Sequence, residues 1–195
     1  ISHGVSKVVC LSTDKAVYPV NALGITKALM EKVVESSARN LGEGDTVLTI
    51  VRYGNVLFSR GSVIPLFMKQ IKEKKAISVT EPDMTRFLLP LKEATGLVTF
   101  ALEQGRQGDV FVRIAPSCSV GDLAQAVKNI FRSDSEIKII GMRHGEKLYE
   151  TLASKGELLR SEDMGEYLRV SIDDRGLNYN KYLNEGDMKV ISTED

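Results

Sequence analysis

Side chains that can exchange protons and bind a ligand follow one another near the start of the chain: Ser12, Thr13, Asp14 and Lys15. A carboxyl group and an amine side by side can act as general acid and general base when both reach the substrate. They come directly after residues 8–11, an apolar run that is typical of a buried strand. Because open α/β sheets bind ligands at the carboxyl ends of their strands, we expect this cluster to face a ligand.

A second lysine, Lys27, follows in the first turns of an expected helix. A lysine there can hold a ribose hydroxyl and lower the pKa of a neighbouring group. Two plainer interpretations stay open, because Ser, Thr and Asp often form a turn without doing chemistry, and a single helix lysine is more often solvated. The strand tip and Lys27 together favour the catalytic interpretation.

Three arginines, Arg60, Arg86 and Arg143, each lie in a loop or turn after an apolar element. A guanidinium offers a planar fork of donors, so three of them suit the oxygens of a diphosphate. Three ordinary surface arginines are the alternative. Glu146, close to Arg143, can pair with Lys147 or with a ribose hydroxyl, and its spacing does not decide between the two.

Hydrophobic periodicity predicts the elements that position these side chains. Helices are expected over about 21–41, 63–71, 91–103 and 119–131, and strands over 8–11, 46–51, 76–80, 109–114 and 136–140. Polar segments follow apolar elements at 12–15, 52–55, 85–87 and 143–147. Strands that alternate with helices predict an α/β fold. From residue 161 the pattern weakens into a polar tail, which we expect to pack along the surface or onto a neighbouring subunit.

Composition limits the classes of function. The chain has 195 residues, 43% of them hydrophobic, and equal numbers of Lys+Arg and Asp+Glu, 26 of each. A net charge of zero gives no broad basic field for a nucleic acid or an anionic membrane. Cys10 and Cys118 show no metal-ligand spacing, two histidines cannot form a histidine cluster, and no apolar run approaches the roughly 20 residues of a membrane span. We expect a cytoplasmic protein with no metal and no membrane insertion.

Four segments together identify a family. They are LSTDKAVYPVNALGITKALMEK, RYGNVLFSRGSVIPLF, MTRF and RHGEKLYETL, in this order. Over about residues 4–182 the chain closely resembles the inverting UDP-N-acetylglucosamine 4,6-dehydratases of capsule and surface-polysaccharide synthesis, the CapE type. These are extended short-chain dehydrogenase/reductases. The resemblance implies the carboxy-terminal part of a Rossmann-type parallel sheet plus a smaller α/β substrate-binding region.

The resemblance also implies roles for individual residues. Asp14 would be the acid that protonates the leaving hydroxyl, Lys15 the base near C5, Thr13 a hydrogen-bond partner of the C4 oxygen, and Lys27 a holder of the nicotinamide ribose. The implied cofactor contacts are Ser12, Lys27 and Tyr53. The implied contacts to the UDP-sugar are Asn55, Arg60, Ser62, Arg86, Arg143 and Glu146.

One position departs from the wider superfamily. Short-chain dehydrogenases usually have a tyrosine four residues before the helix lysine, where this chain has Leu23. The CapE branch lacks that tyrosine too, so the departure favours this branch. Leu23 has no proton to exchange, which leaves the base for the C4 hydroxyl unassigned, with Tyr18 as the candidate.

A second departure concerns the cofactor. Family members carry a glycine-rich dinucleotide fingerprint in an amino-terminal half, and no G-x-G-x-x-G follows a strand here. By resemblance, residues 1–56 are the last part of the NAD(P)-binding fold, 57–160 the UDP-sugar-binding region and 161–195 a tail for packing or oligomer contact. NAD or NADP would be bound mostly by the absent half. An incomplete sheet exposes an edge strand and apolar surface, so we expect a homo-oligomer or a missing partner half that covers them.

Three functions follow. The leading one is 4,6-dehydration of UDP-N-acetylglucosamine or a related UDP-sugar, with the isolated chain not expected to be active alone. A UDP-sugar epimerase of the same superfamily is the first alternative, because epimerases return the hydride to the same carbon and need no Asp-Lys pair. A non-catalytic fragment or UDP-sugar-binding module is the second.

Overall fold

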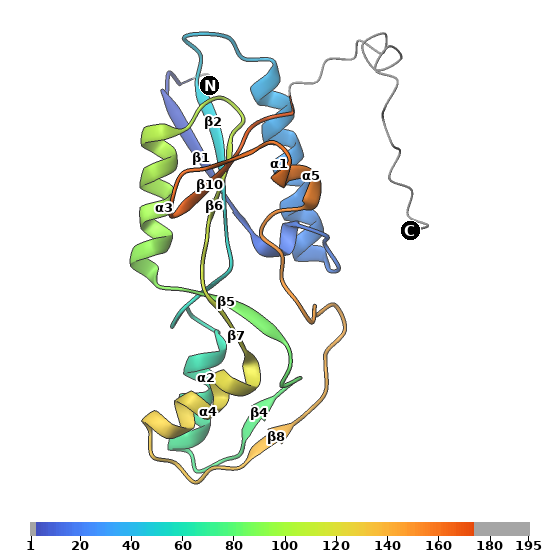
Figure 1. Ribbon diagram of the computed structural model, residues 1–195, viewed down its shortest axis with the longest axis vertical. Helices are drawn as coiled ribbons and strands as arrows, with labels where there is room; N and C mark the ends of the chain where they lie inside the picture. The colour runs from blue at the N-terminus through green and yellow to red at the C-terminus, as the bar shows by residue number, and fades with distance from the viewer. Residues whose placement is uncertain (1–2, 174–195) are drawn as a thin grey trace.

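The strand tip that carries Asp14 belongs to the main sheet of a two-lobed molecule (Figure 1). The computed structural model describes residues 3–173. Strand β1 (Lys7–Thr13) pairs in parallel with β2 (Val47–Tyr53), which pairs in parallel with β6 (Val110–Arg113). The antiparallel strands β10 (Tyr167–Val170) and β9 (Ser161–Asp163) complete the order β1-β2-β6-β10-β9. The carboxyl ends of the three parallel strands therefore meet at one edge.

Two helices cover the opposite faces of this sheet (Figure 1). Helix α1 (Ala22–Arg39) places Val34 against Ile50 of β2, whereas α3 (Leu91–Gln104) places Leu97 against Val51, the next residue of the same strand. Successive side chains of a strand point to opposite faces, which is why an unbroken apolar strand is needed between two helices.

The lower lobe holds a second set of helices and strands around a separate core. These are β3 (Asn55–Val56), α2 (Val63–Lys72), β4 (Ile77–Val79), β5 (Thr85–Leu89), β7 (Ser117–Ser119), α4 (Val120–Ile130) and β8 (Ile137–Ile139). Phe67 of α2, Ile77 of β4 and Ala124 of α4 are completely buried in this core. Two short helices, η1 (Asp14–Ala16) and α5 (Lys155–Leu158), lie in the upper lobe.

The α/β class and the parallel sheet are confirmed, and the long helices match the prediction closely. The division along the chain differs from the expected ranges. Helix α3 and strand β6 return to the main sheet although they fall within 57–160, and β9 and β10 belong to that sheet although they fall within 161–195. Residues 174–195 of the expected tail lie outside the described residues. Hydrophobic periodicity predicts where a helix or strand lies along the chain, but not to which lobe it belongs.

Exposure of β1 and α1 also differs from the expectation of buried apolar positions. Strand β1 has a partner on one side among the described residues, and Leu11 is 45% exposed. On α1, Leu29 is 63% and Val33 56% exposed. Within residues 3–173, no helix is long and apolar enough to cross a membrane.

Candidate active site

The polar strand tip forms a compact cluster around the Asp14 carboxylate. After the extended residue Thr13 the chain turns into η1, which brings the Lys15 side chain back toward Asp14. The Oδ1 atom of Asp14 accepts hydrogen bonds from Thr13 Oγ1 at 2.8 Å and from Lys15 Nζ at 3.0 Å. Asp14 is completely buried, and its Oδ2 atom has no hydrogen-bond partner in the described part of the chain. One oxygen is thus saturated while the other remains available.

Two glycines allow the neighbouring backbone to approach this tip. A Cβ atom on Gly24 of α1 would lie 2.3 Å from the carbonyl oxygen of Lys15. A Cβ atom on Gly54 would lie 2.6 Å from the Cβ of Phe87 and 3.2 Å from Asp14 Oδ2. Real Cβ atoms are not found 2.3 or 2.6 Å from another heavy atom, so both positions require the close approach that glycine permits.

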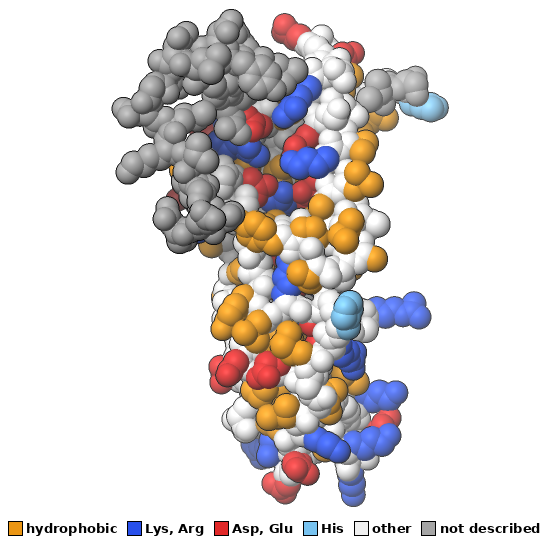
Figure 2. Space-filling view, turned by 90° about the vertical axis from the view of Figure 1, so that its right-hand side faces the viewer, with side chains coloured by type: hydrophobic (Ala, Val, Ile, Leu, Met, Phe, Trp, Pro, Cys, Tyr) orange, Lys and Arg blue, Asp and Glu red, His pale blue; other side chains and the backbone are white. Residues whose placement is uncertain are grey.

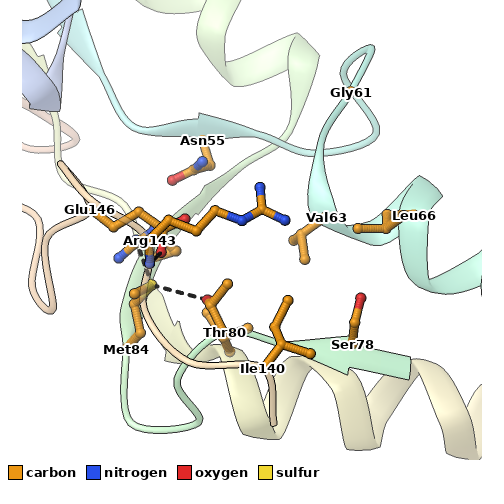
Figure 3. A pocket seen from close by; sticks show the side chains of 12 residues that line it. Asn55, Gly61, Val63, Leu66, Ser78, Thr80, Met84, Ile140, Arg143 and Glu146 are labelled. Carbon is orange, nitrogen blue, oxygen red and sulfur yellow. Dashed lines mark hydrogen bonds between the residues drawn. The ribbon is translucent and has the colours of Figure 1, made fainter. Parts of the chain in front are cut away.

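A pocket in the lower lobe adjoins the strand tip (Figure 3). Asn55 lines this pocket, and the residue before it, Gly54, lies next to the Asp14 carboxylate. Its volume is about 240 Å³. The lining residues are Asn55, Gly61, Val63, Leu66, Ser78, Thr80, Met84, Arg86, Val120, Ile140, Arg143 and Glu146. The volume lies below the roughly 300–1,000 Å³ of small-molecule sites, so it suits part of a nucleotide sugar.

Charged and polar groups converge on this pocket. Figure 3 shows the Arg143 side chain extending across it toward Val63. The backbone N–H of Arg143 donates to Glu146 Oε2 at 2.9 Å, which fixes the turn that carries the arginine. Arg86 donates to the carbonyl oxygen of Thr85 at 2.6 Å. The Oδ1 atom of Asn55 is buried and unpartnered within residues 3–173, as expected of an atom that meets a ligand.

The other predicted substrate and cofactor contacts lie outside the pocket lining. Arg60 is exposed. Ser62 is the N-cap residue of α2, but its buried hydroxyl makes no capping hydrogen bond and has no partner in the described structure. Ser12 is 3% exposed and donates to Glu31, so its hydroxyl faces the protein interior. Tyr53 packs against the core beneath α3.

The predicted helix lysine and the two positions considered for the C4 base lie near the strand tip. Lys27 Nζ donates to the carbonyl oxygen of Leu11 at 2.9 Å, which holds it against the end of β1. Tyr18 is 61% exposed and adopts a φ of 49°, an uncommon conformation for a residue with a side chain. Leu23 is 55% exposed.

The loop after β8 joins the pocket to the strand tip. Asn21 caps α1 by accepting from the backbone N–H of Gly24 at 2.9 Å, and its Nδ2 donates to the Gly145 carbonyl at 2.8 Å. Lys147 Nζ donates to the carbonyl of Val17 at 2.5 Å. The same loop places the Glu150 carboxylate 3.5 Å from Lys15 Nζ. Sequence reasoning did not single out Glu150.

A buried ion triad lies behind the strand tip. Arg52 of β2 donates from Nε and Nη2 to the two oxygens of Glu31 at 2.8 and 2.6 Å, and from Nη2 to Glu157 Oε1 at 2.8 Å. Burial alone would lower the pKa of Arg52, but its hydrogen bonds to both glutamates raise it. Burial would raise the pKa of Glu157, but the hydrogen bond and charge of Arg52 lower it to about 2. Arg52 and Glu157 are therefore held in their charged forms.

Comparisons with known proteins match most or all of the chain. A family model described as "Polysaccharide biosynthesis protein" matches residues 1–172. A protein of Rickettsia felis named UDP-glucose 4-epimerase is 53% identical over 195 residues, covering 100% of this chain and 57% of the relative. The chain thus spans little more than half the length of that relative.

Solved structures share the fold. The X-ray structure of Pen from Bacillus thuringiensis superimposes with a TM-score of 0.84 at 36% identity, over 89% of this chain and 55% of that one. A dTDP-glucose 4,6-dehydratase from Bacillus anthracis, solved in complex with NAD, gives a TM-score of 0.66 at 14% identity, over 77% of this chain and 53% of that one. The second likeness concerns the fold alone.

Proposed function

We propose, from the premise that this chain belongs to the polysaccharide biosynthesis protein family, that it supplies the acid–base strand tip and the sugar-nucleotide pocket of a 5-inverting UDP-N-acetylglucosamine 4,6-dehydratase. The comparisons support the coarser statement, a member of the extended short-chain dehydrogenase/reductases that act on nucleotide sugars. The observation that carries the finer proposal is the Asp14–Lys15 pair, whose polar atoms lie 3.0 Å apart. Neither residue lines the pocket, but Gly54, next to Asp14 Oδ2, directly precedes the lining residue Asn55.

The two oxygens of Asp14 suggest how the pair would work. Oδ1 accepts from Thr13 and Lys15, so Oδ2 is the oxygen left to hold a proton for the hydroxyl that leaves C6. Lys15, 27% exposed in its side chain, would take the proton from C5 once C4 is a ketone and C5–H is acidic. A general acid and a general base within one pair of neighbouring residues would thus remove water from C5 and C6.

The dinucleotide is implied by the family, and part of its site fits. A bound nicotinamide supplies a hydride acceptor for C4 and a hydride donor for C6. Lys27 is held at the end of β1 by its bond to the Leu11 carbonyl, and it is our candidate for the residue that would bond a ribose hydroxyl. Ser12 fits less well, since its hydroxyl is bound to Glu31. Tyr18 stays our candidate for the base that takes the C4 proton.

An epimerase is the second candidate. The Rickettsia felis relative, 53% identical, is named UDP-glucose 4-epimerase. Epimerisation at C4 removes no water, so the Asp14–Lys15 pair would have no acid–base elimination to perform. The two reactions therefore differ in the mass of their product.

The deciding measurement is product analysis. The chain is incubated, alone and together with the amino-terminal part of a full-length relative, with UDP-N-acetylglucosamine and NAD⁺ or NADP⁺. The sugar nucleotide is then analysed by mass spectrometry and NMR. A 4-keto product lighter by one water supports the dehydratase, whereas a C4 epimer of unchanged mass supports the epimerase. Asp14→Asn should abolish dehydration, and activity that persists in this variant contradicts the proposal.

Calorimetry covers the case in which neither product forms. Binding of the UDP-sugar without binding of the dinucleotide would identify a binding module and overturn catalysis by this chain. Arg143→Gln should weaken UDP-sugar binding, because Arg143 extends across the pocket (Figure 3). Arg132→Gln, at an exposed position outside the pocket lining, is the matched control.

A further inference from the structure

Glu150 is a buried carboxylate at the strand tip to which the proposed function gives no part. Its side chain is 3% exposed. The Oε1 atom lies 3.5 Å from Lys15 Nζ, and Oε2 lies 3.6 Å from Lys147 Nζ. Oε2 has no hydrogen-bond partner among the described residues. A carboxylate removed from water needs a compensating charge, and the two lysines supply it.

These contacts form an alternating row of charges in the order Asp14, Lys15, Glu150 and Lys147. Lys15 faces Asp14 at 3.0 Å on one side and Glu150 on the other. Lys147 is fixed independently, through its bond to the Val17 carbonyl at 2.5 Å. The Lys147 amine is thus fixed by the Val17 carbonyl and holds the Glu150 carboxylate in place. Glu150 can in turn hold the Lys15 amine.

We propose that Glu150 is a positioning residue for Lys15, a role that rests on the proposed function. Its carboxylate holds the Lys15 amine beside Asp14 and stabilises the ammonium that forms when Lys15 takes the C5 proton. The electron pair of the C5–H bond goes into the new C5–C6 double bond as the C6 hydroxyl leaves with the proton of Asp14. The only net loss from the sugar is water. Opposite charges within 4 Å attract strongly in a site with little water, so the carboxylate restrains the amine.

A purely structural role is the alternative, in which Glu150 only fastens the loop after β8 to the strand tip. The two roles differ in their effect on the Lys15 amine. Acylating reagents must approach the amine nitrogen, so the acylation rate of Lys15 reports how firmly its amine is held. Lys27 is a suitable internal reference, because it lies at the end of the same strand but bonds to the Leu11 carbonyl.

The experiment is timed acylation of the full chain with acetic anhydride at neutral pH, followed by peptide mass spectrometry. Glu150→Gln should speed acylation of Lys15 about tenfold, because the amine loses the facing carboxylate that restrains it. The Lys27 rate should not change. Glu150→Asp, which keeps the charge, should restore most of the protection, and Asp134→Asn, an exposed carboxylate outside this row, is the matched control.

Each outcome of the acylation experiment either supports or overturns the positioning role of Glu150. An unchanged Lys15 rate in Glu150→Gln overturns the proposal, and so does an equal rise at Lys15 and Lys27, which would mean that the tip has loosened as a whole. Acylation is measured without substrate, so a failure of the dehydratase proposal would not imitate either result. In protein that turns over, Glu150→Gln should lower kcat and leave KM unchanged, because Glu150 does not line the pocket.

Discussion

The two oxygens of Asp14 have unequal surroundings, because Oδ1 accepts two hydrogen bonds and Oδ2 has no partner among the described residues. Gly54 maintains that inequality, because a side chain at this position would crowd Asp14 Oδ2 and the Cβ of Phe87. A polar segment at the end of a predicted strand led us to Asp14 and Lys15, because open α/β sheets bind ligands at the carboxyl ends of their strands. Nothing in the spacing of residues could reveal the gap that Gly54 leaves.

Gly54→Ala should damage both the fold and the pocket. The new Cβ would meet Phe87 Cβ at 2.6 Å and Asp14 Oδ2 at 3.2 Å, so β5 or the Asp14 carboxylate must move. Overpacking of this kind costs about 1–3 kcal/mol, measurable by denaturant unfolding. UDP-sugar binding should weaken in parallel.

Gly156→Ala is the control for that variant, because a Cβ there has nothing within 4 Å. Its unfolding free energy should not fall. Equal losses of stability in the two variants would mean that the contact at position 54 is not the cause.

At the scale of elements, the buried triad fastens α1, β2 and α5 together. Arg52 contacts Glu31 and Glu157 and also donates to the carbonyl oxygen of Leu152 at 3.3 Å. The capping box of α5, in which Ser154 and Glu157 bond to each other's backbone N–H, fixes the position of Glu157. This connection ties a segment late in the chain to the strand tip.

Acid should therefore weaken the fold through Glu157. Its pKa is about 2 in the folded protein against an ordinary 4.5, so its contribution is complete above about pH 5 and is lost as the pH falls toward 2. The shift corresponds to about 3 kcal/mol of unfolding free energy. Glu157→Gln should lose stability at pH 7 and show a flatter decline between pH 5 and 2, measured by urea unfolding.

Glu43→Gln, at an exposed position, should retain the wild-type pH profile. If Glu157→Gln also retained that profile, the triad would not be the source of the acid sensitivity.

Predictability varied among elements for a physical reason. The helices α1 to α4 bury enough apolar residues at helical spacing to be read from the sequence, and so do β1, β2 and β6. Strands β5, β7, β9 and β10 span three to five residues and are defined by their partners rather than by a pattern of their own. The triad was missed for a related reason, since Glu31, Arg52 and Glu157 meet only after folding.

At the scale of the whole molecule, one side exposes apolar surface. Ile25, Leu29 and Val33 recur every fourth residue along α1 and are 56%, 63% and 56% exposed. Figure 2, which faces this side, shows apolar side chains gathered along it. Nearby, β1 has an open edge among the described residues. Exposed apolar stripes and open strand edges both favour association.

We expect the protein to form a homo-oligomer through this stripe. The molar mass from light scattering should rise with concentration, and Leu29→Lys with Val33→Lys should shift the protein toward the monomer. Ile130→Lys, at a position that is 78% exposed at the end of α4, is the control and should leave the mass unchanged. A mass that stays monomeric at every concentration would rule this interface out.

The single amide of Asn21 has a consequence for the lifetime of the protein. Its oxygen caps α1 and its nitrogen bonds to the Gly145 carbonyl, so helix start and pocket loop share one side chain. Slow hydrolysis of that amide would leave a carboxylate, which still accepts from the helix but repels the carbonyl. An ageing preparation would then keep its helix content while the loop bearing Arg143 and Glu150 came away from the strand tip.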